Sequence, residues 1–320
     1  MKSRYNNYSS AVMEEKQQLT EWLSKKRYKK ETLKTISNYA AHYLHWLESE
    51  RITAPKARYQ DVIAYLSYQR KNGDSENLAS NRIAAVRKYY HYLQYENNEQ
   101  TNPAENLFIK QHKKQLVHDI LTKEQLYHMY QEYSNQSLRQ KRNKVILGIL
   151  IHQALRKEEI TLLKAHHLQL REGKLIVPPN NANNGRTLTL ASDQVLDLQE
   201  YVLVVRPQII KEMKHSKVYG RKPSLQHQSA TIDQLFISMN GSLEMKASLY
   251  HLIKELKKSY EELKGVQQIR MSVITHWLKE KDIREVQYMA GFRYLDSLGY
   301  YQKYHTDELE TALKKYHPLK

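Results

Sequence analysis

Residues 267–302 have the sequence QQIRMSVITHWLKEKDIREVQYMAGFRYLDSLGYYQ, and this segment is the most informative about the fold. Its apolar residues recur at three-to-four spacing, which predicts helices over 272–280 and 283–290. Gly291 follows the second helix directly and is well placed as its C-cap. Arg270 precedes the first helix and Tyr301 follows the glycine. This pair of helices therefore carries a cation and a candidate nucleophile at its two ends.

The first third of the chain is predicted to be a bundle of four or five helices. Only 9 glycines and 7 prolines interrupt the 320 residues, and apolar residues at helical spacing mark four segments. Their apolar faces lie within 19–23, 33–47, 62–66 and 83–93. Ser80 is the predicted N-cap of the last of these helices.

The length of the chain predicts two domains, because a typical domain has roughly 100 to 200 residues. Asn102 and Pro103 break the helical pattern, and the polar, basic segment 110–115 is typical of an exposed linker. Thr122 and Gln125 form a capping-box pattern that starts the next helix. We therefore predict an N-terminal helical domain over 1–108, a basic linker over 109–121 and a C-terminal domain over 122–320.

The C-terminal domain is predicted to add one β-hairpin to further helices. Residues 145–155 are almost free of charge, which predicts a buried helix that leads into Arg156. Residues 174–177 and 186–190 are predicted strands joined by an Asn-rich loop. Other helices are expected over 192–205, 248–263 and 309–316. The predicted fold class is thus mainly α with a small β-hairpin.

The charge of the chain favours a nucleic-acid partner. Lysine and arginine number 51 against 34 aspartates and glutamates, a net charge of +17. A surface so basic attracts polyanions and releases their counterions. The candidate phosphate-contacting residues are Lys25, Lys26, Arg27, Lys29 and Lys30, and in the linker Lys110, Lys113 and Lys114. The alternative is that these charges form only a solvated surface.

Several classes of site are excluded or disfavoured by composition. The chain has no cysteine, so it can form neither a disulfide nor a thiolate metal site, which suits a reducing cytoplasm. Its 15 histidines show no metal-ligand spacing. No apolar stretch approaches the ~18 residues of a membrane span, and the N-terminus has no signal-peptide core. We expect a cytoplasmic, nucleoid-associated protein with no metal, no cofactor and no membrane partner.

Tyrosine and arginine are the residue types that can break and rejoin a phosphodiester without metal or ATP. A tyrosine phenol can store the bond energy in a covalent phosphotyrosyl link that an incoming hydroxyl reverses. A guanidinium grips two phosphate oxygens at once and stays charged. Arg270 and Tyr301 are candidates for these roles.

The order of the motifs resembles the C-terminal signature of tyrosine recombinases, the phage integrase family. Residues 267–270 (QQIR) correspond to the family's His-x-x-Arg box, 290–292 (AGF) to its Leu-Gly-His box, and Tyr301 to its nucleophile. Residues 154–160 (ALRKEEI) correspond to the Gly-Leu-Arg-x-x-Glu-Leu box that holds the family's first arginine. The helical N-terminal part, the basic linker and the hairpin after Arg156 match the family's layout as well.

The resemblance implies a SAM-like core-binding domain followed by a catalytic domain that cleaves double-stranded DNA. Arg156 and Arg270 would hold the scissile phosphate, Gln267 would donate a further hydrogen bond, and Tyr301 would form a 3′-phosphotyrosine. The family further implies an integrase of a mobile element that acts as a tetramer on paired sites. Exchange of a C-terminal helix over 307–316 would lock that tetramer.

The chain departs from the family pattern at three positions. The family's general-acid lysine lies in the hairpin turn, yet no lysine stands within 180–185. Lys174, at the start of the first strand, is the substitute we favour, and Arg186, otherwise a candidate DNA contact, is the other. Gln267 cannot shuttle a proton, and Phe292 replaces a hydrogen-bond donor.

Two alternatives follow from these departures and from the abundance of tyrosine. The chain can be a degenerate recombinase that binds DNA as a regulator without cutting it. Tyr300 or Tyr304 can be the nucleophile in place of Tyr301, since 25 tyrosines weaken any argument from one of them.

Overall fold

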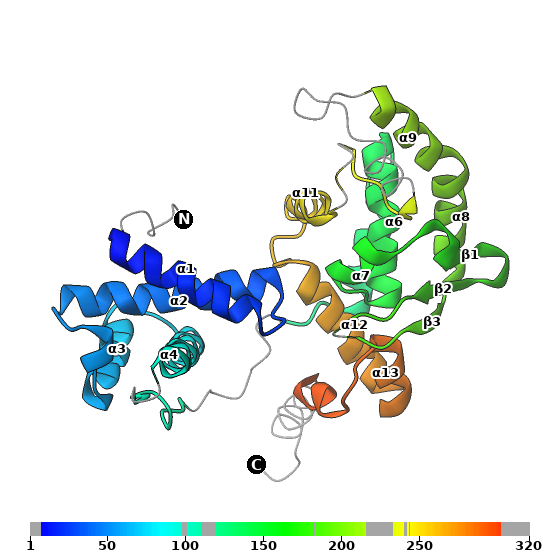
Figure 1. The fold of residues 1–320 in the computed structure, drawn as a ribbon. Helices are drawn as coiled ribbons and strands as arrows, with labels where there is room; N and C mark the ends of the chain where they lie inside the picture. The colour runs from blue at the N-terminus through cyan, green and yellow to red at the C-terminus, as the bar shows by residue number, and fades with distance from the viewer. Residues whose placement is uncertain are drawn as a thin grey trace, which may run out of the picture. The chain divides into compact units, whose positions relative to one another are not determined.

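The computed structural model describes residues 8–97, 101–109, 119–181, 183–215, 233–239, 242 and 244–301 (Figure 1). The chain divides into two compact units, Met1–Lys114 and Gln115–Lys320. The division falls within the predicted linker 109–121. Most of that linker, including Lys110, Lys113 and Lys114, lies outside the described residues, so its bounds stay a prediction.

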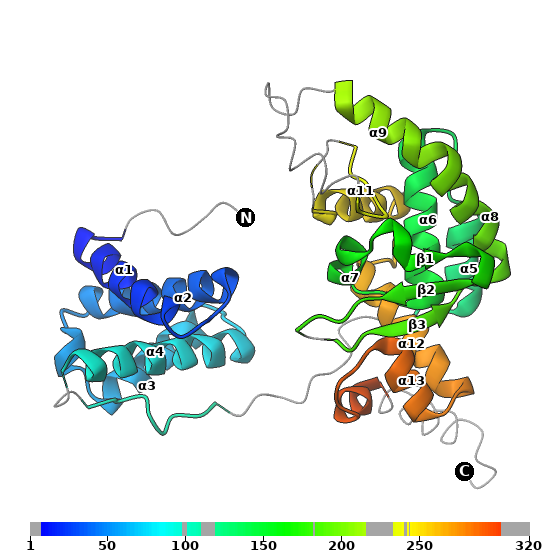
Figure 2. The same ribbon diagram turned by 45° about the vertical axis from the view of Figure 1, so that its right-hand side comes forward.

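The first unit contains the four predicted helices. They are α1 (Ser10–Ser24), α2 (Lys30–Ser49), α3 (Tyr59–Lys71) and α4 (Glu76–Glu96), with a short 3-10 turn, η1 (Ala54–Lys56). Helix α2 packs on both α1 and α4 (Figure 2). The rings of Tyr43, Tyr65 and Tyr90 are buried in the core of this unit. Their hydroxyls find partners, as burial requires: Tyr43 and Tyr90 share a hydrogen bond of 2.9 Å.

The predicted N-cap of α4 is wrong. Ser75, not Ser80, caps this helix, and its hydroxyl accepts from the backbone N–H of Leu78 at 3.3 Å. The apolar face used for the prediction began only at Ile83, two turns after the helix starts at Glu76, so the sequence pattern placed its start too late.

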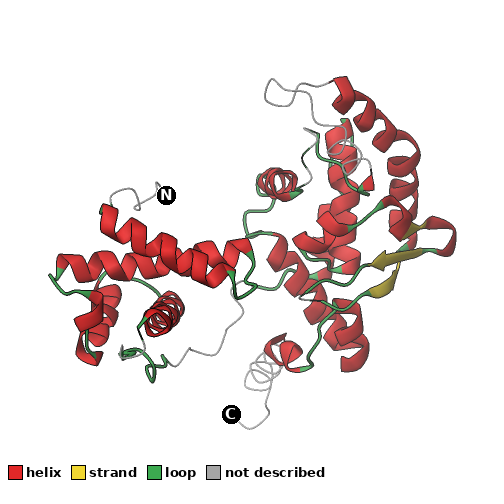
Figure 3. Cartoon of the chain, viewed as in Figure 1, coloured by secondary structure: helices red, strands yellow, loops and turns green. Residues whose placement is uncertain are grey.

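The second unit combines helices with a small three-stranded antiparallel sheet, shown in yellow in Figure 3. The strands β1 (Leu168–Gln169), β2 (Lys174–Val177) and β3 (Arg186–Thr189) lie in this order, and β2 and β3 are the predicted hairpin. Val177 pairs with Arg186 at the end of the hairpin next to its loop, while Lys174 pairs with Thr189 at the other end. The strand β1 was not predicted, because a strand of two residues is too short to show alternating hydrophobicity.

The helices of this unit surround the buried helix α6. Their bounds are α5 (Lys123–Gln131), α6 (Leu138–Gln153), α7 (Lys157–Leu162), α8 (Ser192–Glu200), α9 (Arg206–His215), α11 (Lys246–Leu256), α12 (Val266–Glu280) and α13 (Ile283–Ala290). Short turns lie at η2 (Ala165–His167), η3 (Leu170–Glu172) and η4 (Tyr201–Val205). Helix α6 contacts α5, α8 and α12, and its residues from Val145 to Ile151 are all buried.

The predicted bounds of several helices in this unit are confirmed and others are wrong. Helix α13 and the Thr122 capping box are as predicted. The helix expected over 192–205 extends further, because α8 continues through the π-helical turn η4 into α9, which ends at His215. Helix α11 ends at Leu256, before the expected 263, and α12 begins at Val266. The predicted helix 309–316 lies outside the described residues.

No helix in the described part of the chain is both long enough and apolar enough to cross a membrane. Likewise, none of the described histidine, aspartate and glutamate side chains form a cluster that could hold a metal ion.

Candidate active site

Arg156 lies at the junction between α6 and α7, where the backbone is fixed on both sides. Ala154, just after α6, has a left-handed φ of 48°, a conformation that is costly for a residue with a Cβ. The backbone N–H of Arg156 donates to Oε2 of Glu159 at 2.8 Å. Within the described residues its guanidinium makes no hydrogen bond or ion pair and lies 5.3 Å from the centre of the Phe292 ring. The backbone of Arg156 is therefore fixed, while the N–H groups of its guanidinium are free to donate to a ligand.

Arg270 projects from the second turn of α12 into the interior and is only 6% exposed. Its two terminal nitrogens donate to the carbonyl oxygens of Ala154 and Ala290, the latter at 2.8 Å. Burial, helped by the charge of Arg156, lowers the pKa of Arg270 to about 10, so the group is still charged at neutral pH. These bonds join the end of α6 to the end of α13.

Tyr301 is the last described residue and is 9% exposed. Its ring centre lies 5.9 Å from that of Phe292 and 5.5 Å from that of Tyr300. Burial raises the pKa of its phenol, and the charges of Arg270 and Arg156 oppose this rise. The phenol is therefore neutral at physiological pH and feels the field of both arginines.

Phe292 is the point at which the three predicted residues meet. The guanidinium carbons of Arg156 and Arg270 lie 5.3 and 5.4 Å from its ring centre, within the range of a cation–π contact. The ring of Tyr301 lies against the same phenylalanine. The structure thus brings Arg156, Arg270 and Tyr301 together around one apolar ring.

Glu159 is fully buried next to this cluster and contacts both of its arginines. Besides the Arg156 backbone, it accepts from Asn183 at 2.8 Å and from Arg186 at 2.6 Å, and it lies 4.0 Å from Arg270. Burial alone would raise the pKa of this carboxyl, but hydrogen bonds and the charge of Arg186 hold the pKa below its ordinary value. Glu159 is therefore an anion that fixes the cations around it.

The side chain of Arg186 lies in the interior and not at the surface where the sequence predicted it. We expected a DNA contact or a proton donor, yet its side chain is wholly buried in the ion pair with Glu159. It also donates to the carbonyl oxygen of Met289 at 2.7 Å, near the end of α13. It joins β3, α7 and α13 and has no surface to offer DNA. Nothing in the sequence pattern distinguishes it from an exposed strand-end arginine.

Gly291 allows the Arg186 side chain to pack against the end of α13. Its φ is +68°, and a Cβ built on it would lie 2.8 Å from Cζ of Arg186. The hairpin loop is tied to the same place, because Asn184 donates from its backbone to the Gly291 carbonyl at 3.3 Å and Arg293 donates to the Asn180 carbonyl at 2.9 Å. The loop is thereby anchored to the end of α13.

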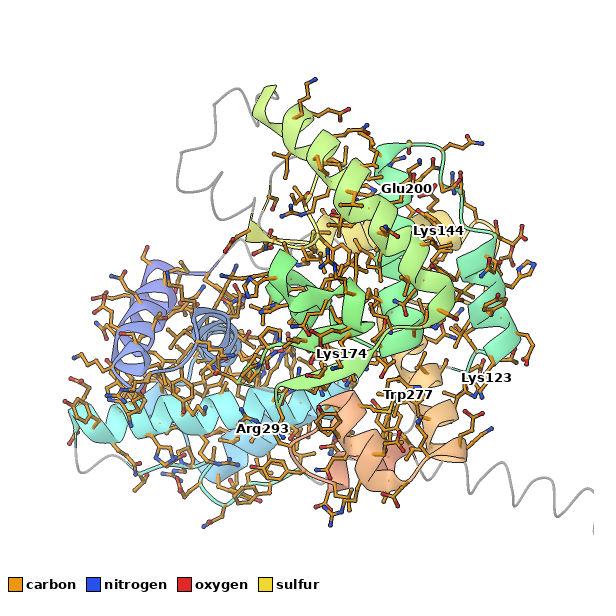
Figure 4. All side chains as sticks on the ribbon, turned by 90° about the vertical axis from the view of Figure 1, so that its right-hand side faces the viewer. Lys123, Lys144, Lys174, Glu200, Trp277 and Arg293 are labelled. Atoms are coloured by element: carbon orange, nitrogen blue, oxygen red, sulfur yellow. The ribbon has the colours of Figure 1, made fainter. Side chains whose placement is uncertain are left out.

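Lys174 and Gln267 are not held in the cluster. Lys174 is exposed at the end of β2 away from the hairpin loop, and its Nζ pairs with Glu172 at 3.1 Å (Figure 4). Gln267 is exposed one turn before Arg270 on α12. The buried amide here is that of Gln268, which donates to the Asp119 carbonyl at 2.9 Å. Sequence reasoning missed Gln268, Asn183 and Gly291's contact with Arg186.

The basic segment between α1 and α2 lies at the surface of the first unit. The side chains of Lys25, Lys26, Arg27, Lys29 and Lys30, which we call the basic turn, are all exposed. Lys26 lies over the ring of Trp22, with Nζ 3.9 Å from its centre. The turn is available for phosphate contacts, which stay a prediction.

Comparison with known proteins places these features in a family. Residues 119–308 match the phage integrase family. The chain is 21% identical to tyrosine recombinase XerC of Staphylococcus carnosus, over 91% of this chain and 92% of that protein. It is 23% identical to tyrosine recombinase XerD of Proteus mirabilis, over 85% and 82%.

Two solved structures share the fold. The Tn1549 transposon integrase in complex with transposon right end DNA has a TM-score of 0.62 at 15% identity, covering 94% of this chain and 99% of that one. The XerH site-specific recombinase bound to difH substrate has a TM-score of 0.63 at 18% identity, covering 84% and 75%. The predicted fold class, mainly α with a small sheet, is confirmed.

Proposed function

This chain belongs to the phage integrase family, and we propose that it is a site-specific DNA recombinase that cleaves and rejoins strands through a covalent 3′-phosphotyrosine. The observation that carries the proposal is the convergence of Arg156, Arg270 and Tyr301 on the ring of Phe292. Two guanidiniums and a phenol in one partly enclosed place provide the charge and the nucleophile that phosphodiester transfer requires.

In this proposal the two arginines bind the non-bridging oxygens of the scissile phosphate. The open guanidinium of Arg156 grips one oxygen, and the N–H groups that Arg270 does not use for carbonyl bonds grip the other. Negative charge that builds up on phosphorus then lies between two cations. Because Glu159 and two carbonyls already hold the Arg270 guanidinium in place, little reorganisation of this arginine accompanies the reaction.

Tyr301 attacks the phosphorus through its phenolic oxygen. The new bond joins phosphorus to Oη, the bond from phosphorus to the 5′-oxygen breaks, and the phenol proton departs while the leaving oxygen gains one. A 5′-hydroxyl from another strand reverses the step and releases the tyrosine. The bond energy is kept in the covalent link, so the proposal needs neither metal nor ATP.

Proton transfer to the leaving oxygen is the weak point of this site. Lys174, the general acid that the sequence favoured, pairs with Glu172 at the end of β2 away from the hairpin loop, so in our proposal it does not protonate the leaving oxygen. General acid–base catalysis contributes about 100- to 10,000-fold. Gln267 is kept as a candidate third donor to the phosphate. We therefore expect a slow recombinase.

Double-stranded DNA is the proposed partner, and the resident compartment is the cytoplasm with its nucleoid DNA. Two proteins of the same fold were solved in complex with DNA, the Tn1549 integrase with transposon right end DNA and XerH with difH substrate. In our proposal the basic turn and the predicted linker contact the phosphates, and four protomers assemble on two sites of a mobile element.

The test uses a duplex selected from random sequence by binding to the protein, remade with single nicks at successive positions. A denaturing gel then shows whether protein and DNA become covalently joined. We expect an adduct from wild type that Tyr301→Phe abolishes and that Arg270→Lys reduces by at least 100-fold. The matched control Arg284→Lys, an exposed arginine on α13, should behave as wild type.

The absence of a lysine from the hairpin loop supports a second candidate, a DNA-binding regulator that has lost cleavage. It predicts tight, salt-sensitive binding to the selected duplex and no adduct at any nick position. An adduct that persists in Tyr301→Phe would instead assign the nucleophile to Tyr300 or to Tyr304, which lies outside the described residues.

A further inference from the structure

Three aromatic side chains of the first unit are exposed beside cations on α4 or next to it. They are Tyr28, Tyr95 and Phe108, and the cations are Lys26, Lys88 and Arg87. We call these six residues together the aromatic surface. None of them belongs to the cluster around Phe292.

Phe108 is the least expected member of the aromatic surface. The chain has three phenylalanines, of which Phe236 and Phe292 are buried while Phe108 is 75% exposed. A phenyl ring has no polar atom that would favour water, so such exposure suggests a binding role. The ring centre lies 4.3 Å from the guanidinium carbon of Arg87.

Hydrogen bonds hold the Arg87 guanidinium in place, and this guanidinium in turn packs on the Phe108 ring. Its Nε donates to the Ala104 carbonyl at 3.1 Å and a terminal nitrogen donates to the Leu107 carbonyl at 2.6 Å. These bonds hold the segment that bears Phe108 against α4. A preorganised ring costs less entropy when a ligand stacks on it.

The other two rings lie beside the basic turn. Tyr95 is 66% exposed, and its ring centre lies 6.1 Å from that of Trp22, which carries Lys26 on its face. Tyr28 lies within the basic turn and contacts Lys88, with Nζ 4.4 Å from the ring centre. Each of these rings therefore lies near a lysine, Tyr28 in direct contact with Lys88 and Tyr95 one ring away from Lys26.

The spacing along α4 suits a chain of nucleotides. Lys88 and Tyr95 are two turns apart and share one face of the helix. The rise per residue separates Arg87 from Tyr95 by about 12 Å along the axis. A strand of a few nucleotides can span this distance with its phosphates on the basic turn.

We propose that the aromatic surface binds unpaired bases of single-stranded DNA. Paired bases are stacked on each other and cannot offer a face to a ring, whereas unpaired bases stack on aromatic side chains regardless of sequence. Cations beside the rings hold the phosphates and add cation–π attraction. This binding site is separate from the strand-transfer site and does not depend on cleavage.

The test compares three fluorescent probes of equal phosphate number with the full-length protein at one salt concentration. The probes are a 20-residue oligothymidylate, the same backbone with abasic residues, and a blunt duplex. We expect oligothymidylate to bind at least fivefold more tightly than the abasic strand. Each of Phe108→Leu and Tyr95→Leu should weaken oligothymidylate binding by at least about fivefold, which corresponds to stacking of about 1 kcal/mol.

The leucine variants keep an apolar side chain and remove only the aromatic face. Tyr59→Leu is the matched control, because this ring is 53% exposed at the start of α3 and no cation lies over it in the described part of the chain. It should leave all three affinities unchanged, and the thermal unfolding of every variant should match wild type. Equal affinities for the thymidylate and abasic strands, or leucine variants that bind thymidylate as wild type does, would overturn the proposal. Neither result depends on whether Tyr301 cleaves DNA.

Discussion

Gly291 is the residue where backbone conformation and the buried ion pair constrain each other. We predict that Gly291→Ala destabilises the second unit by about 1–2 kcal/mol for its left-handed φ, and further because the methyl group displaces Arg186 from Glu159. Adduct formation should fall with it, since Glu159 holds the backbone of Arg156. Thermal unfolding and the nicked-duplex assay measure the two effects.

Gly173→Ala is the control that separates the two causes. Gly173 also has a left-handed φ, of 61°, but a Cβ there would meet nothing within 4 Å. Gly173→Ala should lower the free energy of unfolding only by the cost of the left-handed φ and should leave cleavage unchanged. Equal losses of stability from the two variants would mean that the close approach of Gly291 to Arg186 does not contribute to the stability of the second unit.

The pKa of Tyr301 gives a prediction about pH. Burial raises this pKa above the ordinary value of about 10, although Arg270 and Arg156 oppose the rise. The phenolate fraction therefore grows about tenfold per pH unit across the neutral range. The single-turnover rate of adduct formation on the nicked duplex should rise steadily from pH 6.5 to 9. A rate that is flat over this range would show that proton loss from Tyr301 does not limit the step.

At the scale of elements, the β2–β3 hairpin positions Arg186 but not Lys174. The register puts Lys174 at the end of β2 away from the loop, and its Nζ is paired with Glu172. We predict that Lys174→Ala changes the rate of adduct formation by less than about threefold, far below the loss expected of a general acid. A loss of 100-fold or more would restore Lys174 as the proton donor.

Most elements near the site could be predicted from sequence because their signals are local. The capping box at Thr122, the glycine after α13 and the apolar periods of α6 and α13 each lie within a few residues. The start of α12 could not, because its N-cap is Gly265, which offers no capping side chain; Arg270 is inside the helix and not at its start.

Arg186 could not be assigned from sequence for a different reason. Its role depends on Glu159 and Met289, which reach it only through the tertiary fold. A strand-end arginine has the same local pattern whether it faces a carboxylate inside or water outside. The motif order located Arg156, Arg270 and Tyr301, while the residues that hold them needed three-dimensional contacts.

At the scale of the whole molecule, a net charge of +17 predicts strongly salt-dependent DNA binding. Each lysine that neutralises a phosphate adds about 0.9 to the slope of log K against log salt on duplex DNA. We predict that Lys29→Gln and Lys30→Gln each lower this slope by about 1, with little change in sequence preference. Lys211→Gln, an exposed lysine on α9, serves as the control. An unchanged slope in both basic-turn variants would place the DNA elsewhere on the protein.

In the proposed reaction Tyr301, beside Arg156 and Arg270, becomes joined to DNA. Proteolysis of the adduct from the nicked duplex, followed by mass spectrometric sequencing of the nucleotide-bearing peptide, identifies the joined residue. We predict a single modified residue, Tyr301, linked to a 3′-phosphate. A nucleotide on Tyr300 or Tyr304, or a 5′-phosphate linkage, would refute this assignment.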